Sequence, residues 1–424
     1  MPEEFLQYIW ENRLFTQSGL QTTDGEVIEI VDVGRRNIDS GPDFFNAKIK
    51  IGETLWAGNV EIHKIASDWG RHKHHDDKAY DNVILHVVEK YDAPVLRSNA
   101  EIIPAFEIRY AERLNENYQK LLSAKTWIAC QQQFHKVDLL TFKIAYHRLM
   151  IERLEGKTQE IIQCLEENHH NWNETFYQFL AKFFGFKVNA APFQLLAKSL
   201  PLSILSKHKD NLFQVEAFLF GNAGLLKEQL PGDDYYTSLR DEYSHLFNKY
   251  GLKAIESHLW RFMRLRPVNF PTVRIAQFAA LINSSELLFS KIIEVESIAG
   301  LKTLFDVTAS TYWDTHYRFN KLSKGRIKRI GGSSVDSIII NTVVPFLFVF
   351  GEIQDKHYLK DRALGFLEEL PPEKNSIIKK WGSLGITVRS AYDTQALLQL
   401  KNVYCETKKC LNCQIGNKLI KVTE

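Results

Sequence analysis

Short segments in the first part of the chain carry the alternating or β-branched apolar pattern of β-strands. They are residues 27–33, 45–51, 60–63, 83–88 and 102–108. The last of these contains Pro104, which cannot donate a ladder hydrogen bond and would confine its strand to an edge of the sheet. The pattern therefore predicts at least four strands in one small domain.

Helical spacing of apolar residues flanks this strand-rich region. Residues 3–14 have apolar side chains at helical intervals, and after about Tyr110 the chain is mostly helical between glycine and proline turns. We therefore expect an α+β protein, in which an α/β domain with a mixed sheet occupies residues 1–120. A mainly helical domain that ends in a cysteine cluster would occupy residues 121–424.

The 424 residues are 45% hydrophobic and 25% charged, which is the balance of a globular chain rather than a disordered one. Lys and Arg total 53 and Asp and Glu total 51, which excludes a histone-like polycation but not a local basic groove. The most apolar stretch, residues 338–350, is shorter than the ~20 residues that span a bilayer. The start of the chain is acidic, unlike a signal peptide. We expect a cytoplasmic protein without a membrane segment.

The densest group of reactive side chains lies in the strand-rich part, where five of the 14 histidines fall between residues 63 and 86. Side chains alternate along a strand, so Glu61 and His63 share one face, and Asp43 lies at the mouth of the preceding strand. If the two strands pair, the two carboxylates and the imidazole converge. Such a set suits a divalent ion, Mg²⁺ or Mn²⁺, that activates water for attack on a phosphate group.

These residues resemble the motif of the PD-(D/E)XK nuclease superfamily, which has the restriction-endonuclease-like fold. Pro42 and Asp43 match its Pro-Asp pair, and Glu61 matches the acidic residue of its next strand. His63 stands where the superfamily has its activating lysine, and Lys64 is adjacent but on the other face. The resemblance implies a restriction-endonuclease-like N-terminal domain. It also implies that Asp43, Glu61, His63 and Lys64 form the catalytic centre of a Mg²⁺- or Mn²⁺-dependent nuclease acting on DNA or RNA.

Other residues are candidates for contact with nucleic acid. His72, His74 and His75 lie in a polar loop or short helix, where they can touch phosphate or metal or simply be solvated, and we take His74 and His75 as the candidates. A second segment is basic and contains no acidic residue, a pattern that suits contact with backbone phosphates. Its candidate residues are Lys324, Arg326, Lys328 and Arg329. A solvated helix face with structural ion pairs explains this segment equally well.

Three cysteines near the end of the chain have the spacing of metal ligands. Cys405, Cys410 and Cys413 follow the pattern Cys-x4-Cys-x2-Cys, and Cys130, Cys164 or a histidine can supply a fourth ligand. Zinc is the simpler metal for such a site. Certain nucleases of the same superfamily hold an iron–sulfur cluster with one distant and three C-terminal cysteines, and Cys130 with the three others resembles that set. Reduced cysteines without a metal are the remaining alternative.

Over nearly its full length the chain also resembles an uncharacterised family of bacterial proteins of unknown function. The residues that carry this resemblance are 41–44, 56–63, 85–88, 264–271 and 404–416. That family implies no activity, so the functional prediction rests on the N-terminal motif. We predict a metal-dependent nuclease. The alternatives are a non-catalytic nucleic-acid-binding or scaffold protein built on an inactive nuclease-like domain, and a hydrolase of another phosphorylated substrate.

Overall fold

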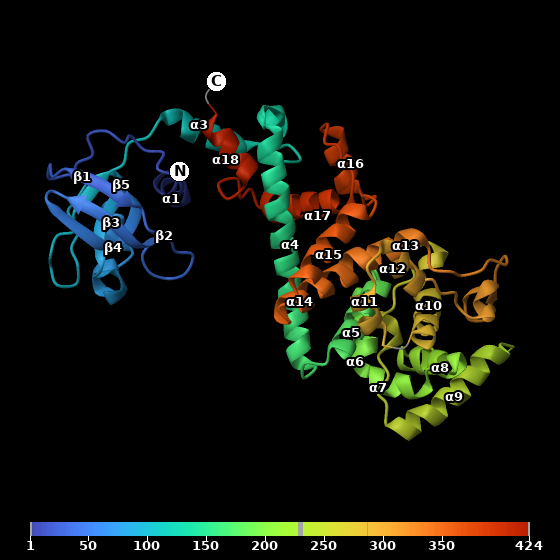
Figure 1. Cartoon of the computed structure of the whole chain (residues 1–424). Helices are drawn as coiled ribbons and strands as arrows, with labels where there is room; N and C mark the ends of the chain where they lie inside the picture. Colours follow the sequence, from blue (N-terminus) through green and yellow to red (C-terminus); the bar gives the residue numbers. More distant parts are fainter. Residues whose placement is uncertain (1, 228–231, 286, 423–424) are drawn as a thin grey trace. The chain divides into compact units, whose positions relative to one another are not determined.

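The computed structural model describes residues 2–227, 232–285 and 287–422. It combines a mixed β-sheet with many helices, as Figure 1 shows. The sheet lies in the N-terminal part of the chain, and helices dominate the residues that follow it. The mixed α and β class that the sequence predicts is therefore confirmed.

Contacts within the chain divide it into two compact units. Unit 1 comprises residues 1–145 and 401–424, and unit 2 comprises residues 146–400. This division differs from the single boundary expected near residue 120. Leu411 and Ile420 pack into the hydrophobic core of unit 1, so the C-terminal segment folds with the N-terminal residues. Local periodicity carries no information about such a long-range return.

Unit 1 is built on a six-stranded mixed sheet. Its strands are β1 (Ile28–Asp32), β2 (Arg35–Arg36), β3 (Phe44–Ile51), β4 (Thr54–Ile65), β5 (Val83–Lys90) and β6 (Ala105–Glu107). The main order is β1-β3-β4-β5-β6, and β2 pairs with β3. β1, β3 and β4 are antiparallel neighbours, whereas β5 and β6 continue parallel to β4. The segment with Pro104 does form an edge strand, and β6 begins directly after the proline.

The alternation along β3 decides which side of the sheet faces the core. Ala47 and Ile49 are fully buried, whereas Lys48 between them is exposed. The helix α1 (Glu3–Glu11) packs against β4 and contributes Phe5 to the same hydrophobic core. The helix predicted at the start of the chain is thus confirmed, and its apolar stripe is the face that covers the sheet.

A short helical segment joins β4 to β5. It consists of α2 (Asp68–Arg71) and two 3₁₀ turns, His74–Asp76 and Lys78–Tyr80. Parallel neighbouring strands require a crossover connection, so this segment must return the chain to the end of the sheet at which β4 begins. Trp69 is buried with Val88 in a small hydrophobic cluster and anchors the segment against β5. The connection therefore holds its histidines close to β4.

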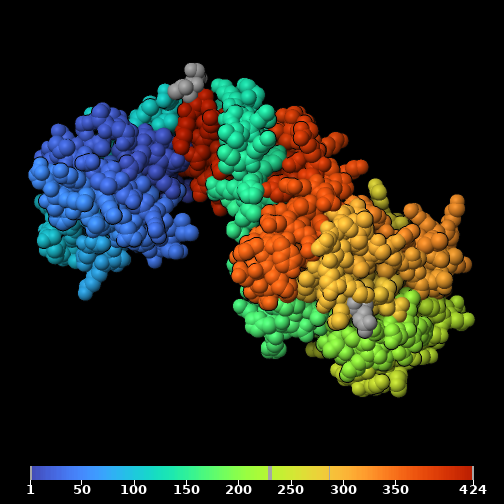
Figure 2. Space-filling view, viewed as in Figure 1, coloured from blue at the N-terminus to red at the C-terminus, as the bar shows by residue number. Residues whose placement is uncertain are grey.

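The last elements of unit 1 come from distant parts of the sequence. They are α3 (Glu112–Ser123), a 3₁₀ turn (Gln131–Lys136) and the C-terminal α18 (Gln414–Lys421). α18 packs on α3, and Figure 2 shows the red C-terminal atoms beside the cyan atoms of that region. The side-chain amide of Asn117 donates to the carbonyl oxygen of Ile420 at 3.2 Å. This bond closes the C-terminal end of α18 onto α3.

Unit 2 is mostly helical and has its own hydrophobic core. The helix α4 (Leu139–Glu167) begins in unit 1 and continues into unit 2. The elements that follow it are α5 (Trp172–Phe184), α6 (Ala190–Ser199), α7 (Leu202–Leu205), α8 (Leu212–Asn222), α9 (Asp234–Tyr250), α10 (Pro271–Ser284), α11 (Leu288–Glu294), α12 (Ile298–Leu304), β7 (His316–Arg318), β8 (Lys321–Leu322), α13 (Gly332–Ile338), α14 (Val344–Ile353), α15 (His357–Glu369), α16 (Ser376–Ser383) and α17 (Ala391–Gln399). The two strands form a small antiparallel hairpin.

The apolar stretch that the sequence analysis noted is part of a longer helix. α13 and α14 are joined by the π-helical turn Ile339–Val343, and Pro345, which lacks an N–H, lies just beyond that turn. The combined helix, residues 332–353, is long and apolar enough to cross a membrane by length and composition. However, 72% of its most apolar window is buried inside the protein, as in the core helix of a folded domain.

Candidate functional site

The pairing of β3 with β4 brings together two acidic residues that are 18 positions apart. Phe44 pairs with Val60, and the ladder becomes irregular just after this pair, where Asn46 has a left-handed backbone (φ 57°). Asp43 therefore lies opposite Glu61 in the antiparallel register. The backbone N–H of Asp43 donates to Oε2 of Glu61 at 3.0 Å. The predicted convergence of these two residues is present in the structure.

The carboxylate of Asp43 is held by two donors. The backbone N–H of Ile62 donates to Oδ2 at 3.0 Å, and Nε2 of Gln7 donates to Oδ1 at 2.7 Å. Gln7 lies on α1, and its own Oε1 accepts a hydrogen bond of 2.9 Å from Arg36 on β2. Side chains from a helix and an edge strand thus orient the carboxylate at the mouth of β3.

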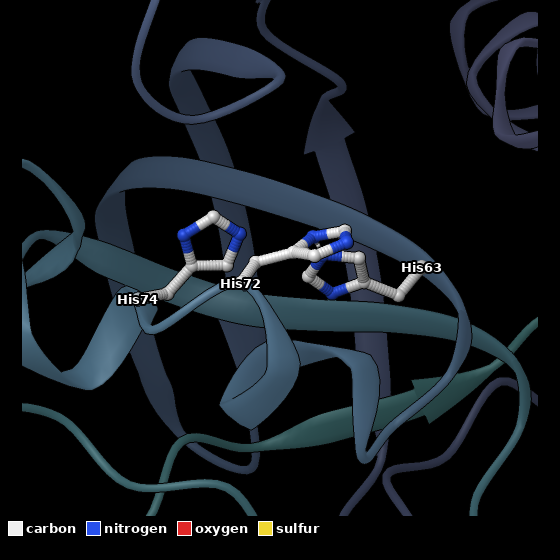
Figure 3. A group of neighbouring side chains, drawn as sticks. All are labelled: His63, His72 and His74. Carbon is white, nitrogen blue, oxygen red and sulfur yellow. Dashed lines mark hydrogen bonds between the residues drawn. The ribbon is translucent and has the colours of Figure 1, made fainter.

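Three imidazoles gather at the same place, as Figure 3 shows. His63 projects from β4, His72 follows α2, and His74 begins the next turn. Nε2 of His63 lies 3.1 Å from Nδ1 of His72, and one ring nitrogen of each residue lies within 4.8 Å of the other two. Oε1 of Glu61 lies 3.6 Å from Nε2 of His63 and 3.4 Å from Nε2 of His74. We call Glu61, His63, His72 and His74 the donor cluster.

Aromatic side chains hold the imidazoles in place. The ring of Tyr80 stacks on that of His74, with 3.8 Å between centroids, and Trp69 meets His63 and His86 edge to face. Nε2 of His86 lies 2.8 Å from Nδ1 of His63. Packed rings have little rotamer freedom, so the donor atoms are presented by side chains that are already fixed.

Burial dominates the electrostatics of the site. It raises the pKa of Glu61 to about 8, and together with the charge of Glu61 it raises the pKa of Asp43 to about 7. It lowers the pKa of His63 to about 2, with further lowering from the neighbouring His86. The imidazole of His63 is therefore neutral at pH 7 and offers a lone pair. A bound cation would lower the pKa of both carboxyl groups and offset the free energy that is needed to bury their charges.

The three imidazoles of the donor cluster lie close enough together to hold one metal ion. Nε2 of His74 is buried without a hydrogen-bond partner among the described residues, although it faces the carboxylate of Glu61. Buried polar atoms in folded proteins normally have partners, so an unpartnered nitrogen aimed at other donor atoms points to a ligand. Neutral imidazoles combined with one carboxylate form a donor set that first-row transition ions accept.

Besides Asp43, which lies beside Glu61, two residues predicted for the site lie outside the donor cluster. Lys64 follows His63 on β4 and, by alternation along the strand, faces the other side, as the sequence indicated. His75 is exposed and lies 3.5 Å from Asp76, whereas its neighbour His74 is half-buried and belongs to the cluster. The structure thus divides the predicted His74 and His75 pair into one clustered and one solvated residue.

The basic segment of residues 324–329 lies in unit 2 and is only partly available to solvent. Lys328 is 3% exposed, and its Nζ donates to two backbone carbonyl oxygens of its own unit at 3.1 and 2.9 Å. Arg329 pairs with Asp306. Lys324 and Arg326 are exposed. Of the four residues predicted in this segment, Lys328 alone is therefore buried, whereas Arg329 is exposed although it has an acidic partner.

The cysteines predicted as metal ligands fall into the same unit, and all are free thiols. They are Cys130, Cys405, Cys410 and Cys413. Cys164, which the sequence left as an alternative fourth ligand, lies in unit 2. Its Sγ lies 3.4 Å from Nδ2 of Asn168, and that contact belongs to the helical core of unit 2.

The sequence did not reveal every residue of the site. His72 was a possible contact to phosphate or metal but was not among the predicted site residues, because its place depends on the path of the connection between β4 and β5. Gln7 and Arg36 orient Asp43 only through tertiary contacts. Tyr80 was not considered, although an aromatic residue within a histidine-rich segment could have suggested a ring-stacking partner.

Comparison with known proteins adds a family but no function. The model of a family described as a protein of unknown function (DUF2851) matches residues 3–376. This match covers most of both units. Neither the curated proteins nor the solved structures gave a match to the chain.

Proposed function

Since the chain belongs to DUF2851, a family of unknown function, we propose its function from the geometry of unit 1. We propose that unit 1 is a metal-dependent nuclease that hydrolyses phosphodiester bonds in DNA or RNA. The donor cluster would hold one divalent metal ion. Asp43 lies beside the cluster and accepts hydrogen bonds from Gln7 and the backbone of Ile62. It would accept a proton from the attacking water.

The spacing of the donor atoms carries this proposal. Two ligand atoms that each lie about 2.1 Å from one tetrahedrally coordinated ion are on the order of 3.4 Å apart. The contacts His72–His63, His63–Glu61 and Glu61–His74 join donor atoms that are 3.1, 3.6 and 3.4 Å apart. These neighbouring donor atoms therefore have the separation of ligands on a single ion, and the three imidazole nitrogens all lie within 4.8 Å of one another.

The donor set also narrows the choice of metal. Imidazoles bind zinc, iron, copper and nickel well, whereas Mg²⁺ prefers oxygen ligands and retains several waters. With three imidazoles and one carboxylate, the cluster favours a first-row transition ion over the Mg²⁺ that the sequence motif suggested. Mn²⁺ and Zn²⁺ are the two ions to test first.

The order of elements supports a nuclease rather than another metal-dependent enzyme. A leading helix is followed by three antiparallel neighbours, a short helical connection and a parallel strand. Asp43 directly precedes β3, and Glu61 and His63 lie within β4. This placement agrees with the PD-(D/E)XK resemblance, in which the acidic residues lie on two paired strands. The departure is His63, which replaces the lysine and joins the metal ligands.

The chemistry assigns separate tasks to the residues. A metal ion in such a site polarises a phosphoryl oxygen and lowers the pKa of water. Glu61 and the three imidazoles hold that ion through fixed side chains. Asp43 is placed to accept a proton from the attacking water, because Gln7 and the backbone of Ile62 fix its carboxylate beside Glu61. The water oxygen would form a new bond to phosphorus as the bond to the leaving oxygen breaks, and the leaving oxygen would keep the bonding electrons and take a proton from solvent.

One observation favours the non-catalytic alternative. The superfamily's lysine is replaced by His63, which is 1% exposed and shares a hydrogen bond with His86. Lys64 does not belong to the donor cluster and so does not replace that lysine. If the lysine is indispensable for hydrolysis, unit 1 would bind a metal and a nucleic acid without cutting it.

Cleavage assays on purified full-length protein distinguish the two functions. After dialysis against EDTA, the protein would be given Mn²⁺, Zn²⁺ or Mg²⁺ with linear and circular DNA and RNA. We expect cutting with a transition ion, loss of cutting in His74→Ala and Asp43→Asn, and wild-type cutting in the matched control His75→Ala. Calorimetry should show that Asp43→Asn still binds the ion and that His74→Ala binds it weakly.

Two results would contradict the proposal in different ways. If the wild type binds the ion tightly but cuts no nucleic acid, the nuclease is excluded and the binding function remains. If cutting persists in His74→Ala and Asp43→Asn, the activity comes from elsewhere or from a contaminant.

A further inference from the structure

Four cysteines that are far apart in the sequence are neighbours in unit 1. Burial raises the pKa of Cys130 and of Cys405. The charges of Cys413 and Cys410 raise the pKa of Cys130 further, and those of Cys130, Cys413 and Cys410 raise that of Cys405. Through these interactions all four thiols belong to one group. Cys164 is outside this group because it lies in unit 2.

The turn that carries three of these cysteines is tightly built. Cys405 ends the π-helical turn Leu400–Cys405, and Lys408 then adopts a left-handed conformation (φ 53°). The N–H of Cys413 donates to the carbonyl oxygen of Cys410 at 3.4 Å. A Cβ atom on Gly416 would lie 2.2 Å from that carbonyl oxygen. Glycine is therefore required for α18 to start so close to Cys410.

Two lysines that flank Cys405 contact the segment just before Cys130. Nζ of Lys408 donates to the carbonyl oxygens of Leu122 and Ala124 at 2.5 and 3.0 Å. Nζ of Lys401 lies 5.5 Å from the ring centre of Trp127. The C-terminal segment is thus fixed to residues that lie three to eight positions before Cys130.

The surroundings of the thiols are apolar. Cys410 belongs to the hydrophobic core of unit 1, and Cys130 packs against it. Burial raises the pKa of both, to about 12 for Cys130 and about 11 for Cys410. Four neutral thiols in such a place would act only as small hydrophobes, and nothing in packing alone explains why four gather from two distant segments.

We infer that Cys130, Cys405, Cys410 and Cys413 bind one structural zinc ion that ties the C-terminal segment to the rest of unit 1. Four thiolates without an open position form a closed tetrahedral site, which is the arrangement of structural zinc. Zinc binding releases the thiol protons and turns the buried thiols into thiolates that the ion neutralises. This site is independent of the donor cluster and of the proposed nuclease activity.

Metal binding would also tighten the group. Among the described residues, the three imidazoles of the donor cluster are the set whose ligand atoms all lie within 4.8 Å of one another. No three of the four thiols form such a set, so Zn–S bonds of about 2.3 Å would draw them together.

Zinc release by a thiol-specific mercurial tests this inference, because mercurials displace zinc from thiolates and leave imidazole sites intact. Full-length protein would be titrated in the presence of a zinc indicator dye. We expect one zinc per chain from the wild type, almost none from Cys410→Ser/Cys413→Ser, and one from the matched control Cys164→Ser. Cobalt in place of zinc should give the intense visible bands of a tetrahedral thiolate site in the wild type and in the control.

The variant with two serines is open to the objection that it does not fold. His74→Ala with all cysteines intact keeps the turn and should still release one zinc with the mercurial, which separates this site from the donor cluster. Absence of mercurial-released zinc from wild-type protein grown with ample zinc would overturn the inference. Stoichiometric iron with broad visible absorbance, or equal zinc loss in Cys164→Ser, would overturn it as well.

Discussion

Nδ1 of His63 lies 2.8 Å from Nε2 of His86, a residue of β5 that is completely buried. If Nε2 of His63 presents its lone pair to a metal, its Nδ1 must carry the proton and donate it to His86. His86 then carries its own proton on Nδ1, an atom that has no hydrogen-bond partner in the described part of the chain. That unpaired donor is a cost, and it is offset if His86 serves to fix the tautomer and ring orientation of His63.

This relationship predicts the effect of replacing His86. His86→Ala should weaken metal binding by about 10–100-fold without removing a ligand, as other outer-shell substitutions do. His86→Gln should restore part of the affinity, because its amide oxygen can accept from Nδ1 of His63. Isothermal titration with Mn²⁺ or Zn²⁺ measures both, with the exposed His75→Ala as control. Equal affinity in His86→Ala and wild type would show that His86 only fills space.

Glu61→Gln should separate metal binding from stability. The substitution keeps the shape of a side chain that is 5% exposed but removes its charge. We expect metal affinity to fall by at least tenfold, while the melting temperature of the metal-free protein stays the same or rises, because a buried carboxylate is poorly solvated. Glu53→Gln, in the exposed turn between β3 and β4, should change neither quantity. A lower melting temperature for metal-free Glu61→Gln would indicate that the carboxylate is a structural element.

Much of unit 1 could be predicted from the sequence because strand alternation is a local property. The burial of Ala47 and Ile49 and the shared face of Glu61 and His63 follow from a period of two residues. The donor cluster needed more than this. His72 and His74 reach it only because the connection between β4 and β5 crosses back over the sheet.

Long-range features explain the remaining differences between sequence and structure. The C-terminal segment joins unit 1 through contacts such as that of Asn117 with Ile420, which no periodicity in either segment reveals. The basic run near Gly325 gave no sign that Lys328 would be buried against carbonyl oxygens of its own unit. The number of basic residues in a segment can be read from the sequence, whereas the groups that each side chain contacts depend on the fold.

Gly58 provides a stability test for the strand that carries the site. A Cβ atom at this position would lie 2.4 Å from Cγ2 of Ile84 and 2.7 Å from the carbonyl oxygen of Asn82. Gly58→Ala should therefore destabilise unit 1 by about 1–3 kcal/mol, the usual range for overpacking. Urea denaturation followed by tryptophan fluorescence measures the change. Gly52→Ala is not a suitable control because its φ is positive, whereas Ala57→Ser, at an exposed position of the same strand, should be nearly neutral.

A buried acid in unit 2 gives that unit a predictable response to pH. Glu216 is 1% exposed on α8, and its two oxygens accept hydrogen bonds of 2.6 Å from Tyr235 and 2.8 Å from Ser310. Burial raises its pKa from 4.5 to about 7. Between pH 4.5 and pH 7 this group is protonated in the folded protein but ionised in the unfolded chain. The free energy of unfolding of the protein must therefore fall as the pH rises through this interval.

The expected loss between pH 4.5 and pH 7 is roughly 3 kcal/mol, at about 1.4 kcal/mol per pKa unit. Glu216→Gln cannot ionise, so its unfolding free energy should lack this component and should exceed that of the wild type most clearly at pH 8. Urea denaturation at pH 5 and pH 8 gives the comparison, with the exposed Glu160→Gln as a control that keeps the wild-type pH response. A Glu216→Gln variant with the same decline as the wild type would show that Glu216 is already ionised in the folded protein at pH 5.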